Sequence, residues 1–106
     1  MSLSLDIDDL ATLRNELENV ALHWMDIGIL LGIGIRKLEA IAAEVSGSMD
    51  RLTKMLTIWL KWDYNYTKYG RPSWRRLVEV VALSSGGGNP NLAMKIARKH
   101  MYEGIF

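Results

Sequence analysis

The chain has 106 residues, of which 49% are hydrophobic and 24% are charged, and its formal net charge is +1. This length and composition are typical of one soluble globular domain, spanning residues 1–106, with a single hydrophobic core. The absence of cysteine excludes disulfides, a thiolate nucleophile and cysteine-bound zinc. The acidic start does not resemble a signal peptide, and no run of ~18 apolar residues suggests a membrane span. We therefore expect a cytoplasmic protein with no membrane insertion.

The charges are unevenly distributed along the chain. Residues 1–35 carry six acidic side chains and one arginine, whereas the remainder carries twelve Lys and Arg and six Asp and Glu, so the two parts have net charges of −5 and +6. This uneven distribution of charge is either accidental or suited to a molecule in which one face binds the opposite face of a neighbouring molecule.

Helical periodicity begins near the N-terminus. Asp6 is the expected N-cap of a first helix, with Asp8 and Asp9 favourably placed in its first turn. A second helix is expected over residues 18–31. The buried stripes of these two helices are Leu10, Leu13 and Leu17, and then Val20, Trp24, Ile27 and Leu31.

Four further helices follow. The third stops near residues 46–48, the fourth matches the i, i+3, i+4, i+7, i+8 template, and the fifth starts around residues 72–73. After a loose stretch over residues 84–90, the last helix begins with Asn89 as N-cap and Pro90 at N1. Six helices in this length predict an all-α fold with short connections and antiparallel packing. The expected buried stripes are Leu38, Ile41, Ala42 and Val45; Leu52, Met55, Leu56, Trp59 and Leu60; Trp74, Leu77, Val78 and Val81; and Leu92, Ala93, Ile96 and Ala97.

Three glycines interrupt the pattern at positions 28, 32 and 34. Their order, G-x-x-x-G-x-G within helical flanks, is neither a dinucleotide-binding nor a Walker spacing. A membrane dimer face would need a ~20-residue apolar span, which Asp26 and Arg36 interrupt. We instead expect a helical corner, in which Gly28 permits close packing, Gly32 ends the second helix in the left-handed conformation, and Gly34 frees the turn into the third helix.

Five motifs, in order and at suitable intervals, resemble those of death domains. Trp24-x-x-Ile27-Gly28-x-x-Leu31-Gly32 is similar to the W-x-x-L-G-x-x-L-G signature of helix two in that family. The later motifs are Leu38-x-x-Ile41, Met55-Leu56-x-x-Trp59-Leu60, Pro72-Ser73-Trp74-x-x-Leu77-Val78 (with serine in place of the usual threonine) and Asn91-Leu92-Ala93. The resemblance covers about residues 20–100.

This resemblance implies an antiparallel six-helix bundle with Greek-key connectivity. It also implies a non-enzymatic adaptor that associates with other death-fold domains in apoptotic or innate-immune signalling. The aromatic loop at residues 62–69 and the glycine run at residues 86–88 depart from the family's common pattern.

The candidate partner-binding residues lie in four groups. The aromatic loop with Trp62, Asp63 and Tyr64 either covers the end of the core or forms a contact edge. The cations Arg71, Arg75 and Arg76, with others at residues 95–100, form either a solvated face or a patch that seeks acidic residues on another molecule. The acidic candidates are Asp8, Asp9 and Glu16. The resemblance adds Arg36, Lys37 and Glu39 on the third helix.

The tryptophans at positions 24, 59 and 74 suit core packing better than a ligand box, because each lies on a stripe that its helix must bury. His23 and His100 lack neighbouring metal ligands, and Ser84 and Ser85 lack a nucleophile-elbow motif. We therefore expect no enzyme activity, no metal and no cofactor. The predicted structural core comprises Trp24, Leu31, Leu38, Ile41, Leu56, Trp59, Trp74, Leu77, Leu92 and Ile96.

Two functions remain open from the sequence. The first is homotypic association with death-fold partners, including self-association into head-to-tail oligomers through unlike patches. The alternative is a small helical nucleic-acid-binding domain that uses the cations of the last two helices. The near-neutral net charge argues against this alternative, so no nucleic-acid partner is expected.

Overall fold

The computed structural model describes residues 4–83 and 88–101, and the predicted all-α class is confirmed for them. The six predicted helices correspond to α1, α2 with the preceding turn η2, α3, α4, α6 and α7. The aromatic loop holds a further short helix, α5, that the sequence pattern did not predict. Residues 84–87, in the predicted loose stretch, lie outside the described residues. The elements are η1 (Ile7–Asp9), α1 (Leu10–Glu16), η2 (Glu18–His23), α2 (Trp24–Leu31), α3 (Ile35–Glu44), α4 (Ser48–Leu60), α5 (Tyr66–Tyr69), α6 (Trp74–Leu83) and α7 (Pro90–His100).

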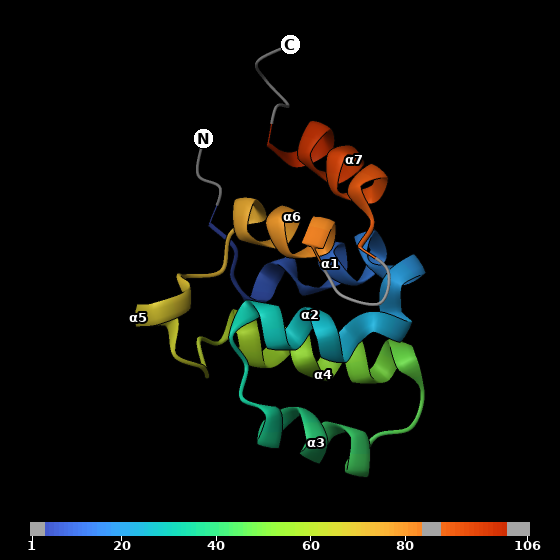
Figure 1. Ribbon diagram of the computed structural model, residues 1–106, viewed down its shortest axis with the longest axis vertical. Helices are drawn as coiled ribbons and strands as arrows, with labels where there is room; N and C mark the ends of the chain where they lie inside the picture. Colours follow the sequence, from blue (N-terminus) through green and yellow to red (C-terminus); the bar gives the residue numbers. More distant parts are fainter. Residues whose placement is uncertain (1–3, 84–87, 102–106) are drawn as a thin grey trace.

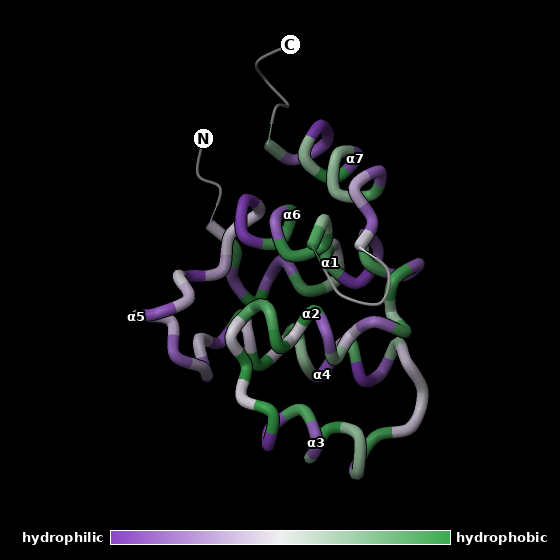
Figure 2. Tube along the Cα trace, viewed as in Figure 1, coloured by the Kyte–Doolittle hydropathy of each residue, from purple (hydrophilic) through white to green (hydrophobic). Residues whose placement is uncertain are grey.

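The helices are arranged along one long axis, with α7 at one end and α3 at the other (Figure 1). The principal dimensions are 44 × 27 × 22 Å. Helix α4 packs against α1, η2, α2 and α3, whereas α7 packs mainly against α6. The segment around α5 projects from the side of the molecule and is largely hydrophilic (Figure 2). Among the described residues, no helix is long and apolar enough to cross a membrane.

Both predicted N-caps are confirmed. The Asp6 carboxylate accepts a hydrogen bond from the Asp8 N–H, and the Asp9 carboxylate accepts one from the Asp6 N–H, each at 2.9 Å. This capping box begins the 3₁₀ turn η1, which leads into α1. At α7 the Asn89 side chain accepts from the Leu92 N–H at 2.9 Å, and Pro90 occupies the first turn.

The predicted second helix is broken. Residues 18–23 form the 3₁₀ turn η2, in which Val20 has φ −115° and ψ 17°, and the α-helix starts only at Trp24. Val20 and its neighbour Ala21 are both buried, as is Leu17 one turn earlier. These i, i+3 and i+4 positions would also share one face of a regular α-helix, so the buried pattern does not reveal the break.

Two of the three glycines act as expected. A Cβ on Gly28 would lie 2.7 Å from Leu38 Cδ2 and 3.1 Å from Met55 Cγ, so the missing side chain lets α2 pack closely on α3 and α4. Gly32 has φ +102° and ends α2. The role predicted for Gly34 is wrong, because its φ of −61° suits any residue and no atom lies within 4 Å of a Cβ added there.

The three tryptophans expected in the core are buried in a single apolar cluster. Leu92 is half-buried against that cluster, and Val80, not Val78, lies on the buried face of α6. Leu5, which belongs to no predicted stripe, joins the core because its N–H donates to the Pro72 carbonyl at 3.0 Å. The predicted core residues that are buried are Trp24, Leu31, Leu38, Ile41, Leu56, Trp59, Trp74, Leu77 and Ile96.

We predict that Gly28→Ala lowers the free energy of unfolding by about 1–3 kcal/mol, the usual cost of overpacking a filled core. Leu38 and Met55 are fully buried, and both would have to shift to admit a Cβ at Gly28. The control is Gly34→Ser, which has open space at the N-cap of α3 and is expected to be neutral or slightly stabilising. Urea unfolding measures both, and equal stabilities of the two variants would contradict the close packing at Gly28.

Candidate partner-binding surfaces

The aromatic loop starts from an unusual helix end. At the C-terminus of α4, the Trp62 N–H donates to the Trp59 carbonyl and the Asp63 N–H donates to the Ile58 carbonyl, each at 3.0 Å. These two bonds form a Schellman motif, whose left-handed position is usually glycine. Here Trp62 occupies it with φ +63°. Among the described residues, Trp62 is the one non-glycine residue with a positive φ.

Three contacts hold the loop in place, two with the body of the protein and one that closes the loop segment on itself. The Lys37 ammonium donates to the Asp63 carbonyl at 2.6 Å and pairs with its carboxylate at 2.7 Å. The Tyr64 hydroxyl donates to the Gly70 carbonyl at 2.6 Å. The Tyr69 ring lies so close to Gly32 that a Cβ there would be 2.4 Å from Tyr69 Cγ.

Burial raises the pKa of the Tyr64 hydroxyl, and the neighbouring Trp59 indole and the Arg76 charge offset only part of this effect. The Trp59 N–H approaches Tyr64 without the geometry of a full hydrogen bond. Tyr64 therefore stays neutral at physiological pH and acts as a structural donor.

Two other aromatic rings of this segment face outward. The rings of Trp62 and Tyr66 are tilted by 50° with centroids 5.1 Å apart, and each residue is 39% exposed. The Arg71 guanidinium lies 5.2 Å from the centre of the Trp62 ring, in cation–π range. Of the two alternatives for this loop, Tyr64 and Tyr69 follow the first because they cover the body, whereas Trp62 and Tyr66 are exposed, as the second would require.

The structure joins one candidate on α3, Lys37, to the candidates in the loop through its pair with Asp63. We define the α3–loop surface as the residues of α3 and the loop around this pair. Arg36 and Glu39 are exposed on α3, one residue before and two residues after Lys37. Tyr66 was not among the named candidates, although it belongs to the aromatic loop that the sequence pattern singled out. The members are Arg36, Lys37, Glu39, Trp62, Asp63, Tyr66 and Arg71.

Two of the acidic candidates are engaged within the chain. The Asp9 carboxylate belongs to the capping box, whereas Asp8 is exposed. Glu16 accepts from the Lys99 ammonium at 2.9 Å and lies 3.2 Å from the His100 ring nitrogen, and its side chain is only 8% exposed. The expectation that Glu16 offers a free charge to another molecule is therefore corrected, because α7 already neutralises it.

This contact fastens α1 to α7. Burial raises the pKa of Glu16, but the hydrogen bonds and positive charges of Lys99 and His100 outweigh burial, so its pKa lies below the usual 4.5. The other face of His100 stacks on the Trp74 ring at 3.9 Å with an interplanar angle of 1°. His100 thus joins α1, α6 and α7 and is not a free ligand.

Arg76 also requires a correction. Its guanidinium donates to the Leu30 carbonyl at 2.6 Å and lies 3.5 Å from the Glu79 carboxylate. Arg76 is therefore a half-buried cap on the C-terminal end of α2. Of the cations in the last two long helices, Arg75, Lys95 and Arg98 are exposed and form no ion pair among the described residues.

Within the described residues, no group of three or more His, Asp and Glu side chains is placed to hold a metal ion. No family model matches the chain, and comparison with curated proteins and with solved structures gave no significant match.

We predict that Glu16 makes stability fall in acid. A lowered carboxyl pKa stabilises the folded protein above the unfolded value, and this contribution is lost as the pH falls through the folded pKa. The free-energy difference between wild type and Glu16→Gln should therefore shrink as the pH drops below about 4.5. Urea unfolding at several pH values measures it, with exposed Glu39→Gln as the control. A pH-independent difference would contradict this linkage.

We predict that Arg76→Ala lowers the free energy of unfolding by about 1.5–3 kcal/mol, the range for a hydrogen bond to a charged group. Arg75→Ala, one residue earlier and exposed, should change it by no more than about 0.5 kcal/mol. Thermal unfolding of both variants measures this, and equal melting temperatures would show that the Leu30 contact contributes nothing.

Proposed function

We propose that this chain is a non-enzymatic protein-interaction module with the Greek-key connectivity of the death fold. It associates with other death-fold domains, or with itself, in apoptotic or innate-immune signalling in the cytoplasm. The observation that carries the proposal is the exposed Trp62 ring held in a left-handed backbone conformation beside Tyr66 and Arg71.

The strain at Trp62 favours a binding role. A non-glycine residue in this conformation costs about 1–2 kcal/mol, and glycine would close the same Schellman motif without that cost. The ring contacts of Trp62 with Tyr66 and Arg71 lie at the surface. Strained backbone positions cluster at functional sites.

The composition and rigidity of the α3–loop surface suit protein recognition. Tryptophan, tyrosine and arginine are the residues most enriched at energetic hot spots. The Lys37–Asp63 pair and the packing of Tyr69 on Gly32 hold the exposed rings in place before binding. A preorganised surface loses less conformational entropy on association.

Long-range packing supports the family assignment. Gly28 of the first motif contacts Leu38 of the second and Met55 of the third, so residues from three separate sequence motifs meet at one point. Each motif alone is a generic amphipathic pattern. Motifs that belong to one fold are expected to meet in its core, and this contact supports that expectation.

The nucleic-acid alternative draws less support. Of the cations that suggested it, Arg71 covers the Trp62 ring, Arg76 caps α2 and Lys99 pairs with Glu16. Fewer free charges remain for phosphates, which supply most of the affinity for nucleic acid.

We predict that Trp62→Gly and Trp62→Ala both weaken partner binding at least tenfold, because both remove the ring. Trp62→Gly should nevertheless be more stable than Trp62→Ala by about 1 kcal/mol, because only glycine relieves the left-handed strain. Pull-down from a panel of death-fold domains measures binding, and urea unfolding measures stability.

The matched control is Ile7→Ala, which truncates an exposed apolar residue outside the α3–loop surface and should bind as wild type. A wild-type protein that captures no panel member would contradict the proposed function. A Trp62→Gly variant with unchanged binding would contradict the role of this surface.

A further inference from the structure

A second candidate interface lies between α6 and α7. A groove of about 490 Å³ is lined by Val78 and Ala82 of α6 and by residues of α7. The α7 side supplies two buried alanines, Ala93 and Ala97, as a floor of small side chains. Met94, which is 56% exposed, stands at the rim. This is a concave apolar surface open to solvent.

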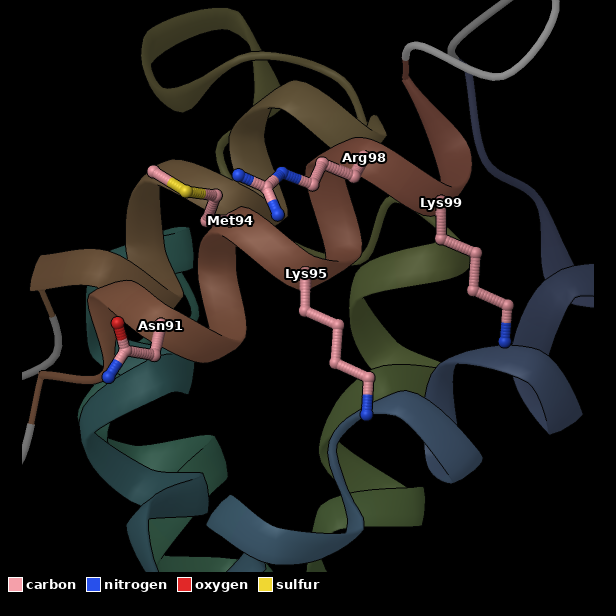
Figure 3. A pocket seen from close by; sticks show the side chains of 5 residues that line it. All are labelled: Asn91, Met94, Lys95, Arg98 and Lys99. Atoms are coloured by element: carbon pink, nitrogen blue, oxygen red, sulfur yellow. The ribbon is translucent and has the colours of Figure 1, made fainter.

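The rim of this groove is cationic. Arg98 lines it together with Met94, and in Figure 3 the Arg98 guanidinium extends toward the Met94 side of α7, while Lys95 and Lys99 extend to the other side. Lys99 is neutralised by Glu16, whereas neither Arg98 nor Lys95 forms an ion pair with an acid of the described residues. Among the described residues, the cations of the groove therefore have no acidic partner.

The opposite chemistry occurs on η2 and α2. Leu22 is 82% exposed and Ile29 is 46% exposed, with Asp26 between them at spacings of four and three residues. Asp26 and Ile29, three residues apart, share one face of α2, and the exposed Leu22 precedes them in η2. We call Leu22, Asp26 and Ile29 the acidic ridge, and its Asp26 forms no ion pair among the described residues.

The geometry points to a contact between two copies of this chain, in which the acidic ridge of one copy docks into the α6–α7 groove of the other. Leu22 and Ile29 bury their apolar surface on the alanine floor, and Asp26 meets Arg98. A helix face with anchors at these spacings is the usual occupant of a hydrophobic groove between helices. Because ridge and groove are different patches, the contact is heterologous and can propagate head to tail.

This inference rests on the proposed function only in that both concern protein association. It uses no residue of the α3–loop surface, so the two surfaces are separable by mutation.

A charge swap tests the contact. We expect wild-type protein to self-associate with rising concentration in sedimentation-velocity experiments, and Asp26→Lys or Arg98→Glu alone to weaken this association at least tenfold. An equimolar mixture of the two variants should regain a dimer, because the mutated ridge of one then faces the mutated groove of the other. Leu22→Ser and Met94→Ser test the apolar half of the contact and do not depend on the charge variants folding.

The controls separate the possible failures. Lys54→Glu reverses an exposed cation on α4, outside the ridge, the groove and the α3–loop surface, and should self-associate as wild type. A wild type that stays monomeric at the highest concentration reached, or self-association that none of the ridge and groove variants weakens, would overturn this inference. Monomeric protein that still binds a panel partner through Trp62 would overturn it while leaving the proposed function intact. Self-association through the ridge that Trp62→Gly does not alter would support the contact, even if no panel partner is captured.

Discussion

The missing side chains at Gly28 and Gly32 are the constraint on which the rest of the structure depends. Leu38 and Met55 fill the space beside Gly28, so α3 and α4 both pack on α2 at this point. One turn later, Tyr69 covers Gly32 and fixes where the aromatic loop returns to the body. The corner between α2 and α3 therefore positions the loop, and with it the outward orientation of Trp62 and Tyr66. A side chain at Gly28 would displace Leu38 of α3 and Met55 of α4, and one at Gly32 would displace Tyr69, because closely packed cores leave little room for added atoms.

The cations of the chain show a second organising rule, since several of them reach back to carbonyl groups at helix ends. Arg76 donates to the Leu30 carbonyl near the end of α2, and Arg51 donates to the carbonyls of Ala42 at 3.0 Å and Val45 at 2.6 Å at the end of α3. Lys37 does the same with the Asp63 carbonyl after α4. Helix C-termini carry unsatisfied carbonyls and partial negative charge, so long cationic side chains stabilise them. Three of the twelve Lys and Arg side chains in the second part of the chain thus stabilise helix ends.

The separation along the chain between contacting residues explains which features could be predicted from the sequence. The capping residues Asp6 and Asn89, the left-handed Gly32 and the buried stripes depend on neighbours within a few residues, and local patterns predicted them. The contact of Glu16 with Lys99 joins residues 83 positions apart, and nothing in either neighbourhood distinguishes a paired charge from a free one. Trp62 was missed as a left-handed residue for a related reason. Local propensity places glycine there, and only the tertiary anchoring of the loop compensates the strain.

The two proposed interfaces follow from what remains after these internal contacts are satisfied. Charges engaged within the chain, such as Glu16 and Arg76, cannot be offered to a partner without breaking contacts that hold helices together. The charges left over, including Asp26 and Arg98, lie beside exposed apolar residues on different helices. The α3–loop surface is separate from both in its residues. On these proposals one copy engages a partner through the loop while it contacts another copy through the ridge or groove, and several weak contacts then act together as one multivalent interaction.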